Sequence, residues 1–132
     1  MSQYIWIALG SGLGGVTRFA VSGLIAQRYG ETFPWGTLFI NVSGSFIIGF
    51  FAALTAPDGR FLVGGTVRQF VMTGILGGYT TYSSFSLQTL ALARDGEWLR
   101  AGANATGTFV LCFLAVWLGP LCATWLNPLK GS

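Results

Sequence analysis

Four long apolar runs constrain this chain more than any other feature of its sequence. A membrane-spanning helix takes about 20 mostly apolar residues, and each run is at least that long. The runs cover residues 4–26, 34–56, 61–93 and 98–126, and the links between them cover 27–33, 57–60 and 94–97. Links this short place neighbouring helices antiparallel in one bundle. The sequence thus predicts an all-α integral membrane fold with four spans, forming a single domain over residues 1–132.

Composition excludes several classes of protein. Hydrophobic residues make up 52% of the chain and charged residues only 8%, whereas soluble domains carry about 25% charged residues. There is no histidine, and the acidic residues all lie in short polar stretches: Glu31, Asp58, Asp95 and Glu97. This removes most general acid–base chemistry and most metal sites, so we do not expect an enzyme. The net charge of +3 comes with scattered arginines, which argues against nucleic-acid binding.

Lysine and arginine are distributed evenly between the two sides of the predicted bundle. One side carries Arg60, Arg68 and Lys130, and the other carries Arg28, Arg94 and Arg100. Because positive charge in short loops normally sets orientation, this balance gives no strong preference. Either one early charge or the N-terminus decides the orientation, or both orientations are inserted and pair as an antiparallel dimer. Four helices alone enclose little space, which favours a pore between subunits.

A glycine-rich stretch in the first run matches two patterns. Residues 10–15 fit the G-x-G-x-x-G of dinucleotide-binding domains. That fingerprint requires alternating strands and helices, which the apolar runs do not show, so we reject it. Gly10 and Gly14 instead form a GxxxG step, which favours close helix packing in lipid, and Gly74 and Gly78 form a second step.

Arg18 lies within the first run, a few residues past its midpoint. A central arginine costs about 3 kcal/mol on insertion scales, and none of the apolar runs contains an acidic partner for it. Either the side chain extends to the membrane interface, or it is a buried cation that attracts an anion or binds backbone carbonyls. An anion pathway would use this charge better than a cation pathway.

The third run holds the most informative stretch of the chain, residues 74–86. Three glycines are followed there by five hydroxyl residues: Thr80, Thr81, Ser83, Ser84 and Ser86. Glycine and β-branched threonine weaken a helix, and non-helical backbone at membrane depth is tolerated only inside protein or beside water. We therefore predict a break in the third span, the alternative being an unbroken helix with back-bonded hydroxyls. Carbonyls freed by a break suit a hard cation such as Na⁺.

Tyr82 and Phe85 within this stretch are three residues apart, so they share a helix face. Such a pair is more often plain packing, but among hydroxyls it indicates the lining of a path. The positive edge of an aromatic ring can contact an anion.

Two stripes of uncharged polar residues follow the second and fourth runs at helical spacing. They are Thr37, Asn41 and Ser45, and Asn104, Thr108 and Cys112. Hydrogen bonding between helices would explain the hydroxyl groups. The asparagines are costlier to bury unsatisfied, which favours a watery or ion-bearing lining whose amide and hydroxyl groups donate to an anion.

Taken together, these motifs resemble the Fluc (CrcB) fluoride channels over essentially the whole chain. The most specific part is Gly74-x-x-Gly-Gly-x-Thr-Thr-x-Ser-Ser-Phe-Ser86, to which Gly36-Thr37-x-x-x-Asn41 and Gly14-x-x-x-Arg18 add. The resemblance implies passive, fluoride-selective conduction that exports the cytoplasmic ion across the bacterial inner membrane and gives fluoride resistance. It also implies a dual-topology, antiparallel homodimer with two pores and a structural Na⁺ at its centre.

The resemblance also assigns roles by position. The fluoride pore would comprise Asn41, Tyr82, Ser83, Ser84 and Phe85. The polar track would comprise Thr37, Asn104, Thr108 and Cys112. The backbone carbonyls of Gly77 and Thr80 would hold Na⁺, and Arg18 would attract the anion.

Two positions depart from the pattern of the family. Members typically carry Phe where this chain has Tyr82, and the added hydroxyl is expected to alter or slow conduction. Cys112 is a poorer donor than the serine often found there.

Two other classes compete with a fluoride channel. A small multidrug-type cation exporter is also a four-span antiparallel dimer, but coupled export of cations typically needs a carboxylate within the membrane, and the runs contain none. A non-transporting assembly subunit would fit the size and the packing motifs, yet it leaves the polar stripes and the broken segment unexplained.

Overall fold

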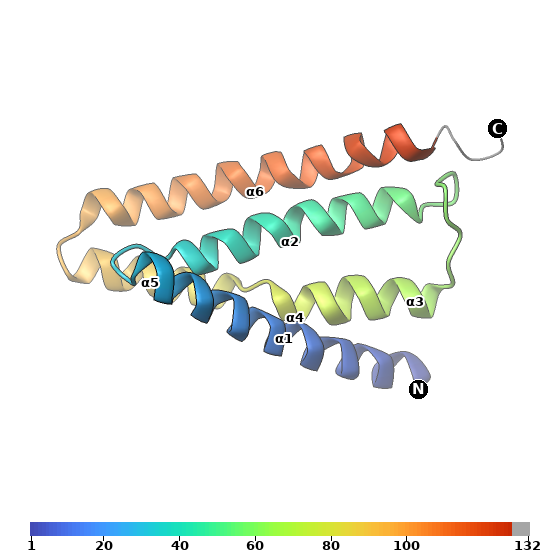
Figure 1. Cartoon of the computed structure of the whole chain (residues 1–132), viewed down its shortest axis with the longest axis horizontal. Helices are drawn as coiled ribbons and strands as arrows, with labels where there is room; N and C mark the ends of the chain where they lie inside the picture. The colour runs from blue at the N-terminus through green and yellow to red at the C-terminus, as the bar shows by residue number, and fades with distance from the viewer. Residues whose placement is uncertain (128–132) are drawn as a thin grey trace.

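The chain folds into long helices joined by short connections, as the apolar runs predict (Figure 1). The computed structural model describes residues 1–127. The continuous helices are α1 (Ser2–Tyr29), α2 (Trp35–Leu54) and α6 (Trp98–Leu126). The third run forms α3 (Gly65–Gln69), the π-helical segment η1 (Phe70–Leu76), α4 (Gly77–Tyr79) and α5 (Tyr82–Arg94).

Of the four predicted spans, the first, second and fourth are uninterrupted helices. Within residues 1–127, the helices long and apolar enough to cross a membrane are α1, α2 and α6. The third run is divided at Thr80 and Thr81, whose backbone is extended, so the predicted break is confirmed and the unbroken-helix alternative is wrong. Its helical part starts at Gly65 rather than at Phe61, because the Phe61 N–H donates to the Leu54 carbonyl at 3.0 Å and holds the chain in the connection after α2.

The connections alternate between the two ends of the bundle, which confirms the predicted antiparallel order (Figure 1). The N-terminus, the connection after α2 and the end of α6 lie at one end, and the α1–α2 and α5–α6 connections lie at the other. Arg60 and Arg68 lie toward the first end, and Arg28, Arg94 and Arg100 lie toward the second. Lys130 lies outside the described residues.

Helix α1 packs against η1 and α4 through the two GxxxG steps, as their spacing predicts. A Cβ atom placed on Gly14 would overlap the carbonyl oxygen of Ile75, and one on Gly78 would lie 2.5 Å from the carbonyl oxygen of Ser11. Gly10 is equally confined by backbone atoms of the same segment. Because backbone touches backbone, any side chain at these positions would push the helices apart.

Helix α2 runs alongside α6 and meets it closely at a second pair of glycines. A Cβ atom on Gly49 would lie 2.5 Å from the carbonyl oxygen of Val116, and one on Gly119 would overlap the carbonyl oxygen of Phe46. Pro120 stands inside α6 and has no N–H to offer the Val116 carbonyl one turn earlier. This carbonyl, without its helical donor, is the one that faces Gly49.

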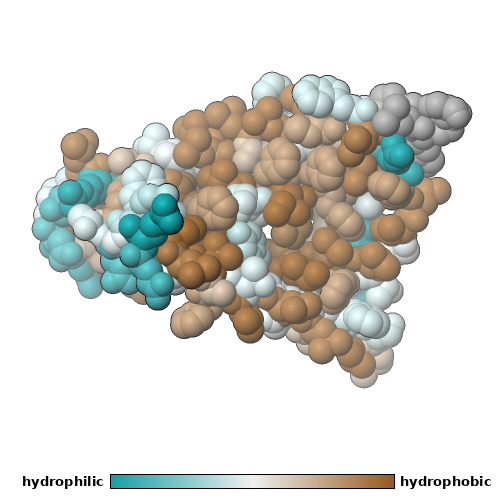
Figure 2. All heavy atoms as spheres, viewed as in Figure 1, coloured by the Kyte–Doolittle hydropathy of each residue, from teal (hydrophilic) through white to brown (hydrophobic). Residues whose placement is uncertain are grey.

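The surface of the chain is apolar over most of its length. Hydrophilic residues gather at the end that holds the α1–α2 and α5–α6 connections, whereas hydrophobic residues cover the middle (Figure 2). Large apolar side chains stand open, among them Phe19 at 82% and Trp125 at 78% exposure. The distribution fits a chain whose middle is covered by lipid or by other membrane helices.

Replacing Gly14 by alanine is expected to destabilise the fold, because the added methyl group would overlap the Ile75 carbonyl. Overpacking of this kind costs about 1–3 kcal/mol. Gly12→Ala is the matched control, since it lies in the same helix and no atom lies within 4 Å of a Cβ placed there. Thermal unfolding in detergent should give a lower midpoint for G14A and an unchanged or slightly raised midpoint for G12A. Equal midpoints would contradict the close helix contact.

Candidate functional site

The break in the third run is short and well hydrogen-bonded at both sides. Thr80 and Thr81 have extended backbones, with φ −85°, ψ 159° and φ −153°, ψ 115°. Before the break, the N–H and the hydroxyl of Thr80 both donate to the Leu76 carbonyl, each at 3.0 Å. After it, the Thr81 hydroxyl accepts from the Ser84 N–H at 3.1 Å and so caps the first turn of α5. The threonine hydroxyls therefore complete both helix ends.

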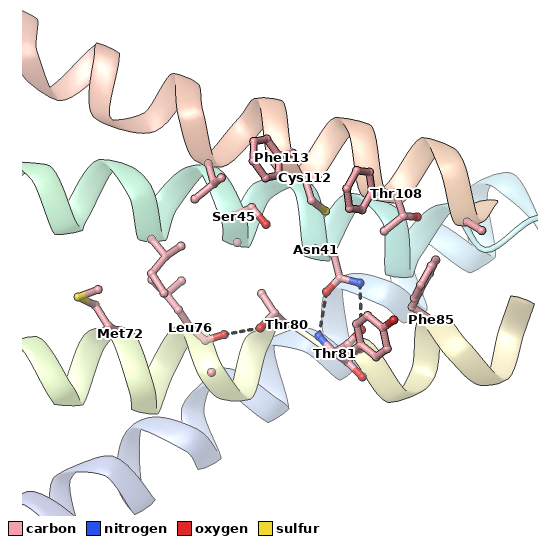
Figure 3. Close-up of a pocket in the computed structure, with 17 residues that line it drawn as sticks. Asn41, Ser45, Met72, Leu76, Thr80, Thr81, Phe85, Thr108, Cys112 and Phe113 are labelled. Atoms are coloured by element: carbon pink, nitrogen blue, oxygen red, sulfur yellow. Dashed lines mark hydrogen bonds between the residues drawn. The ribbon is translucent and has the colours of Figure 1, made fainter. Parts of the chain in front are cut away.

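Asn41 of α2 binds the break from the side (Figure 3). Its Oδ1 accepts from the Thr81 N–H at 2.8 Å, and its Nδ2 donates to the Thr81 carbonyl at 3.0 Å. Asn41 is only 8% exposed. Buried peptide groups need partners, and here a side-chain amide supplies to the Thr81 backbone what a helix would otherwise supply. The Asn41–Thr81 pair therefore stabilises extended backbone in an apolar bundle.

Diverted N–H groups leave two carbonyls without their helical partners. In an unbroken α-helix, the Thr81 N–H would bond the Gly77 carbonyl, and the Ser84 N–H would bond the Thr80 carbonyl. Here these N–H groups donate to the side-chain oxygens of Asn41 and Thr81. The carbonyls of Gly77 and Thr80, which are among those that the break deprives of a helical donor, are the ones that the sequence resemblance assigns to Na⁺. Uncharged oxygen ligands of this kind suit a hard cation.

A cavity of about 670 Å³ lies between α2, α6 and the two halves of the third run, and we call it the central cavity. Its polar and aromatic lining includes Asn41, Ser45, Gly77, Thr80, Thr81, Tyr82, Phe85, Thr108 and Cys112. Ser45, Thr108 and Cys112 face the break across this space in Figure 3. The structure thus gathers predicted residues from three apolar runs around one hollow.

The aromatic pair at the start of α5 has the predicted common face. The rings of Tyr82 and Phe85 lie 5.6 Å apart between centroids at an interplanar angle of 65°, an edge-to-face arrangement. Phe85 is half-buried, whereas Tyr82 is 81% exposed in this chain. The ring of Tyr82 is therefore left largely uncovered by its own chain.

A second cavity, of about 740 Å³, lies on the other side of the break, and we call it the outer cavity. Its lining includes Arg18, Thr37, Thr81, Ser84 and Gln88, with Glu31, Asp95, Glu97 and Arg100 from the connections. Thr81 borders both cavities, so the segment held by Asn41 lies between them. In residues 1–127, the Oε1 of Gln88 is the one buried side-chain oxygen without a hydrogen bond, as expected beside a polar space.

Arg18 turns inward and holds the backbone next to the break. Its Nε donates to the Gly78 carbonyl at 3.1 Å, and the side chain borders the outer cavity. Of the interpretations that the sequence left open, carbonyl binding is confirmed. The contact exists because the GxxxG steps bring α1 close enough for Arg18 to reach the end of α4.

Two predicted site residues lie apart from both cavities. Ser83 is exposed and lies 3.3 Å from the Thr81 hydroxyl, oxygen to oxygen. Asn104 is 2% exposed, donates to the Thr89 hydroxyl at 2.8 Å and accepts from Thr108 at 3.4 Å. Asn104 thus has the role that helix–helix hydrogen bonding predicts for this stripe, joining α6 to α5.

Two features beside the break were missed by sequence reasoning. The π-helical turn of η1 has no residue signature that we recognised. Tyr79, which closes α4, is 9% exposed, and its hydroxyl lies 2.9 Å from the Ser43 hydroxyl of α2. The sequence did offer a signal for this contact: Tyr79 lies directly before Thr80, at membrane depth. A tyrosine buried there usually has a hydrogen-bond partner for its hydroxyl.

The fold and the cavities define a helical membrane protein of several spans, with two cavities that meet at a broken helix. The family model described as "CrcB-like protein, Camphor Resistance (CrcB)" matches residues 5–120. The chain belongs to this CrcB family, as the resemblance of its motifs predicts.

Relatives match the chain over nearly its whole length. A protein of Opitutus terrae called "Fluoride-specific ion channel FluC" is 70% identical over 132 residues, covering 100% of both chains. Proteins of the same name from Methylocella silvestris and Paramagnetospirillum magneticum are each 57% identical, over 130 and 127 residues. These matches cover 98% and 96% of this chain and 99% of each relative.

Replacing Asn41 by leucine is expected to lower the stability of the fold, because both Thr81 peptide groups would lose their partner. An unsatisfied buried polar group costs about 1–3 kcal/mol. Ser45→Ala is the control, since Ser45 lies one turn further along α2 and also borders the central cavity. Thermal unfolding in detergent should give a clearly lower midpoint for N41L than for S45A. Similar midpoints would show that Asn41 does not support the break.

Proposed function

We propose that this chain is a fluoride-selective channel that lets cytoplasmic fluoride leave passively down its electrochemical gradient and so gives fluoride resistance. The proposal is supported by membership of the CrcB family and by relatives called fluoride-specific ion channels. The observation that carries it is the lining of the central cavity by neutral donors and aromatic rings beside a broken helix. No nucleotide site or coupling carboxylate is needed for passive flow.

Fluoride is small and strongly hydrated, so a selective pore must replace its water with close donors. Asn41 is suited to this role because its amide carries a second N–H besides the one bonded to the Thr81 carbonyl. Cys112 offers a weak thiol donor from the opposite wall. Thr108 borders the same space, and its hydroxyl proton is directed to Asn104. Hydrogen-bond donors that the protein holds in place can bind fluoride without first reorienting, as water molecules must.

Tyr82 and Phe85 would contribute the positive edges of their rings. The two rings are arranged edge to face, so their edges point in different directions. Ser84, at the start of α5, would extend the set of hydroxyl donors from the break to the outer cavity. Thr37 and Ser84 border that cavity and would continue the path along α2 and α5.

Arg18 would favour anions over cations in the outer cavity. Its Nε is engaged by the Gly78 carbonyl, but a guanidinium has further N–H groups and a full positive charge. In residues 1–127 the ion pair found is Arg100–Glu97, so no carboxylate contacts Arg18, while Glu31 and Asp95 border the same cavity. A positive charge at the mouth of a low-dielectric passage raises the local anion concentration.

We propose that the working unit is an antiparallel homodimer in the bacterial inner membrane. Helix α5 has no buried residue within the chain, and Tyr82 at its start is 81% exposed. The central cavity is bordered by further exposed rings, Phe109 and Phe113. A second copy would cover these faces, and the even arginine distribution would permit both orientations.

A structural Na⁺ would be held by the carbonyls of Gly77 and Thr80. The residues fit this ion, because the N–H groups that would cover these carbonyls are diverted to Asn41 and Thr81. When bound, Na⁺ would supply a fixed positive charge and tie the break together. Gly77 and Thr80 both border the central cavity, so their segment is accessible from the pathway.

The alternatives are not supported. The relatives are named as fluoride channels rather than as multidrug exporters. The acidic residues of the sequence lie outside the helices that span the membrane, so a carboxylate that could couple export of a cation is missing from these spans. An assembly subunit would leave the cavity beside the broken helix, with its polar and aromatic lining, without a role.

Liposomes that contain the purified protein should release fluoride but retain chloride. Phe85→Ile should reduce the fluoride flux strongly, because the ring edge is lost while the side chain stays apolar. Asn41→Asp should also reduce it, because a carboxylate repels the anion. A fluoride electrode measures the fluoride released by each of the two variants, and empty liposomes are the control. Equal fluoride and chloride rates, or no fluoride flux, would contradict the proposed function.

Tyr82→Phe should keep fluoride selectivity and conduct at least as fast as the natural chain. The substitution removes only the phenol hydroxyl, which belongs to a side chain that is 81% exposed and borders the central cavity. The same liposome assay, run at equal protein density, compares the initial fluoride rates. A slower Y82F channel would show that the hydroxyl serves as a donor rather than as an obstacle.

The purified protein in detergent should have twice the chain mass of 14.1 kDa, measured by native mass spectrometry. Single cysteines placed in the α1–α2 connection, in a chain whose own cysteines are replaced, should react with an impermeant thiol reagent from both sides of the membrane. The N-terminal end serves as the matched second position. A monomer, or labelling from one side only, would contradict the antiparallel dimer.

A further inference from the structure

The break is held by three side-chain anchors, and they follow a pattern along the segment 77–81. Arg18 of α1 holds the Gly78 carbonyl, and Asn41 of α2 holds the Thr81 backbone. The Tyr79 hydroxyl contacts Ser43, also of α2, at 2.9 Å. Anchors thus fall on the first, second and fourth of the residues that follow Gly77. The proposed cation ligands, the carbonyls of Gly77 and Thr80, lie between and beside these anchors.

The direction of the Tyr79–Ser43 hydrogen bond follows from the second contact of Ser43. The Ser43 hydroxyl donates its single proton to the Ile40 carbonyl at 3.2 Å, so its oxygen is left to accept. Tyr79 is therefore the donor to Ser43. Because Ile40 and Ser43 belong to the same rigid helix, this fixes the tip of the tyrosine to the backbone of α2.

Tyr79 also spans the full width between two helices. Its ring lies against Gly44 of α2, where a Cβ would come within 3.3 Å of the ring. Its backbone nitrogen lies close to Gly14 of α1. The side chain is 9% exposed, so little movement is open to it. A change in the contact of Tyr79 with α1 or with α2 would therefore shift the nearby carbonyls of Gly77 and Thr80.

We propose that Tyr79, through its hydrogen bond to Ser43, is a positioning residue for the Gly77 and Thr80 carbonyls that would hold Na⁺. The inference rests on the proposed cation site. Carbonyls without helical N–H partners take their positions from whatever else holds the segment. Gly78 and Tyr79 lie between them, and of these two Tyr79 has a side chain that can anchor the segment. Simple packing of the ring would explain its burial, but it would not require the hydroxyl.

The test separates the hydroxyl from the ring by measuring how Na⁺ stabilises the purified protein. Thermal unfolding in detergent is followed as NaCl replaces N-methylglucamine chloride at constant ionic strength. Tyr79→Phe keeps the ring, and it should raise the Na⁺ concentration for half-maximal stabilisation about fivefold to tenfold, the scale of one lost hydrogen bond. Ser43→Ala should give a similar shift, and the double variant should give little more than either alone.

Matched variants define the controls. Ser43→Thr keeps a hydroxyl and should retain the Na⁺ response of the natural chain. Tyr29→Phe removes a phenol hydroxyl from a side chain that is 64% exposed, and it should change nothing. If the Y79F chain does not fold, S43A makes the same test, because it leaves the tyrosine ring in place.

Two outcomes would overturn the inference. A Y79F chain whose melting midpoint falls equally at every Na⁺ concentration, with an unchanged half-saturation point, would show that the hydroxyl serves only the fold. A natural chain that Na⁺ does not stabilise would remove the cation site, and this inference with it. The fluoride flux assay is independent of both results, so a failed cation site and a failed channel proposal can be told apart.

Discussion

Backbone that leaves its helix inside a bilayer must find hydrogen-bond partners within the protein, and this requirement organises the structure around Thr80 and Thr81. The threonine hydroxyls complete the helix ends, and Asn41 supplies both a donor and an acceptor to the Thr81 peptide groups. Helices α1 and α2 are placed as they are because they must bring these partners to the break. The glycine contacts of α1 serve the same end, since they allow Arg18 to reach the Gly78 carbonyl.

Side-chain replacement of helical hydrogen bonds has a chemical result as well as a structural one. When Asn41 and Thr81 take the N–H groups, the carbonyls of Gly77 and Thr80 are released as ligands. The same exchange gives the bundle an amide and several hydroxyls that face a cavity. Neutral donors and released acceptors arise from a single rearrangement, and the charged side chain of Arg18 donates to the Gly78 carbonyl beside it.

Much of this arrangement could be predicted from the sequence, because it rests on residue types that are costly in lipid. The break followed from glycines and hydroxyls at membrane depth, and the helix contacts followed from the GxxxG spacing. The Asn41–Thr81 hydrogen bonds could not be predicted, because they join residues from two separate runs. The sequence of neither run tells how deep its residues lie in the membrane relative to the other run. Asn104 shows the same limit, because its partner Thr89 was chosen by helix packing rather than by spacing. The π-helical turn of η1 left no recognised signature, although it precedes the break directly.

The glycine contacts also determine how freely the chain can change during evolution. Gly10, Gly14 and Gly78 touch opposing backbone, so drift at these sites would separate α1 from the break and remove Arg18 from its carbonyl. Gly12 and Gly15, in the same stretch of α1, face open space. Residues that read as one glycine-rich motif are therefore under two kinds of constraint: Gly10 and Gly14 are confined by opposing backbone, and Gly12 and Gly15 have room for a side chain within this chain.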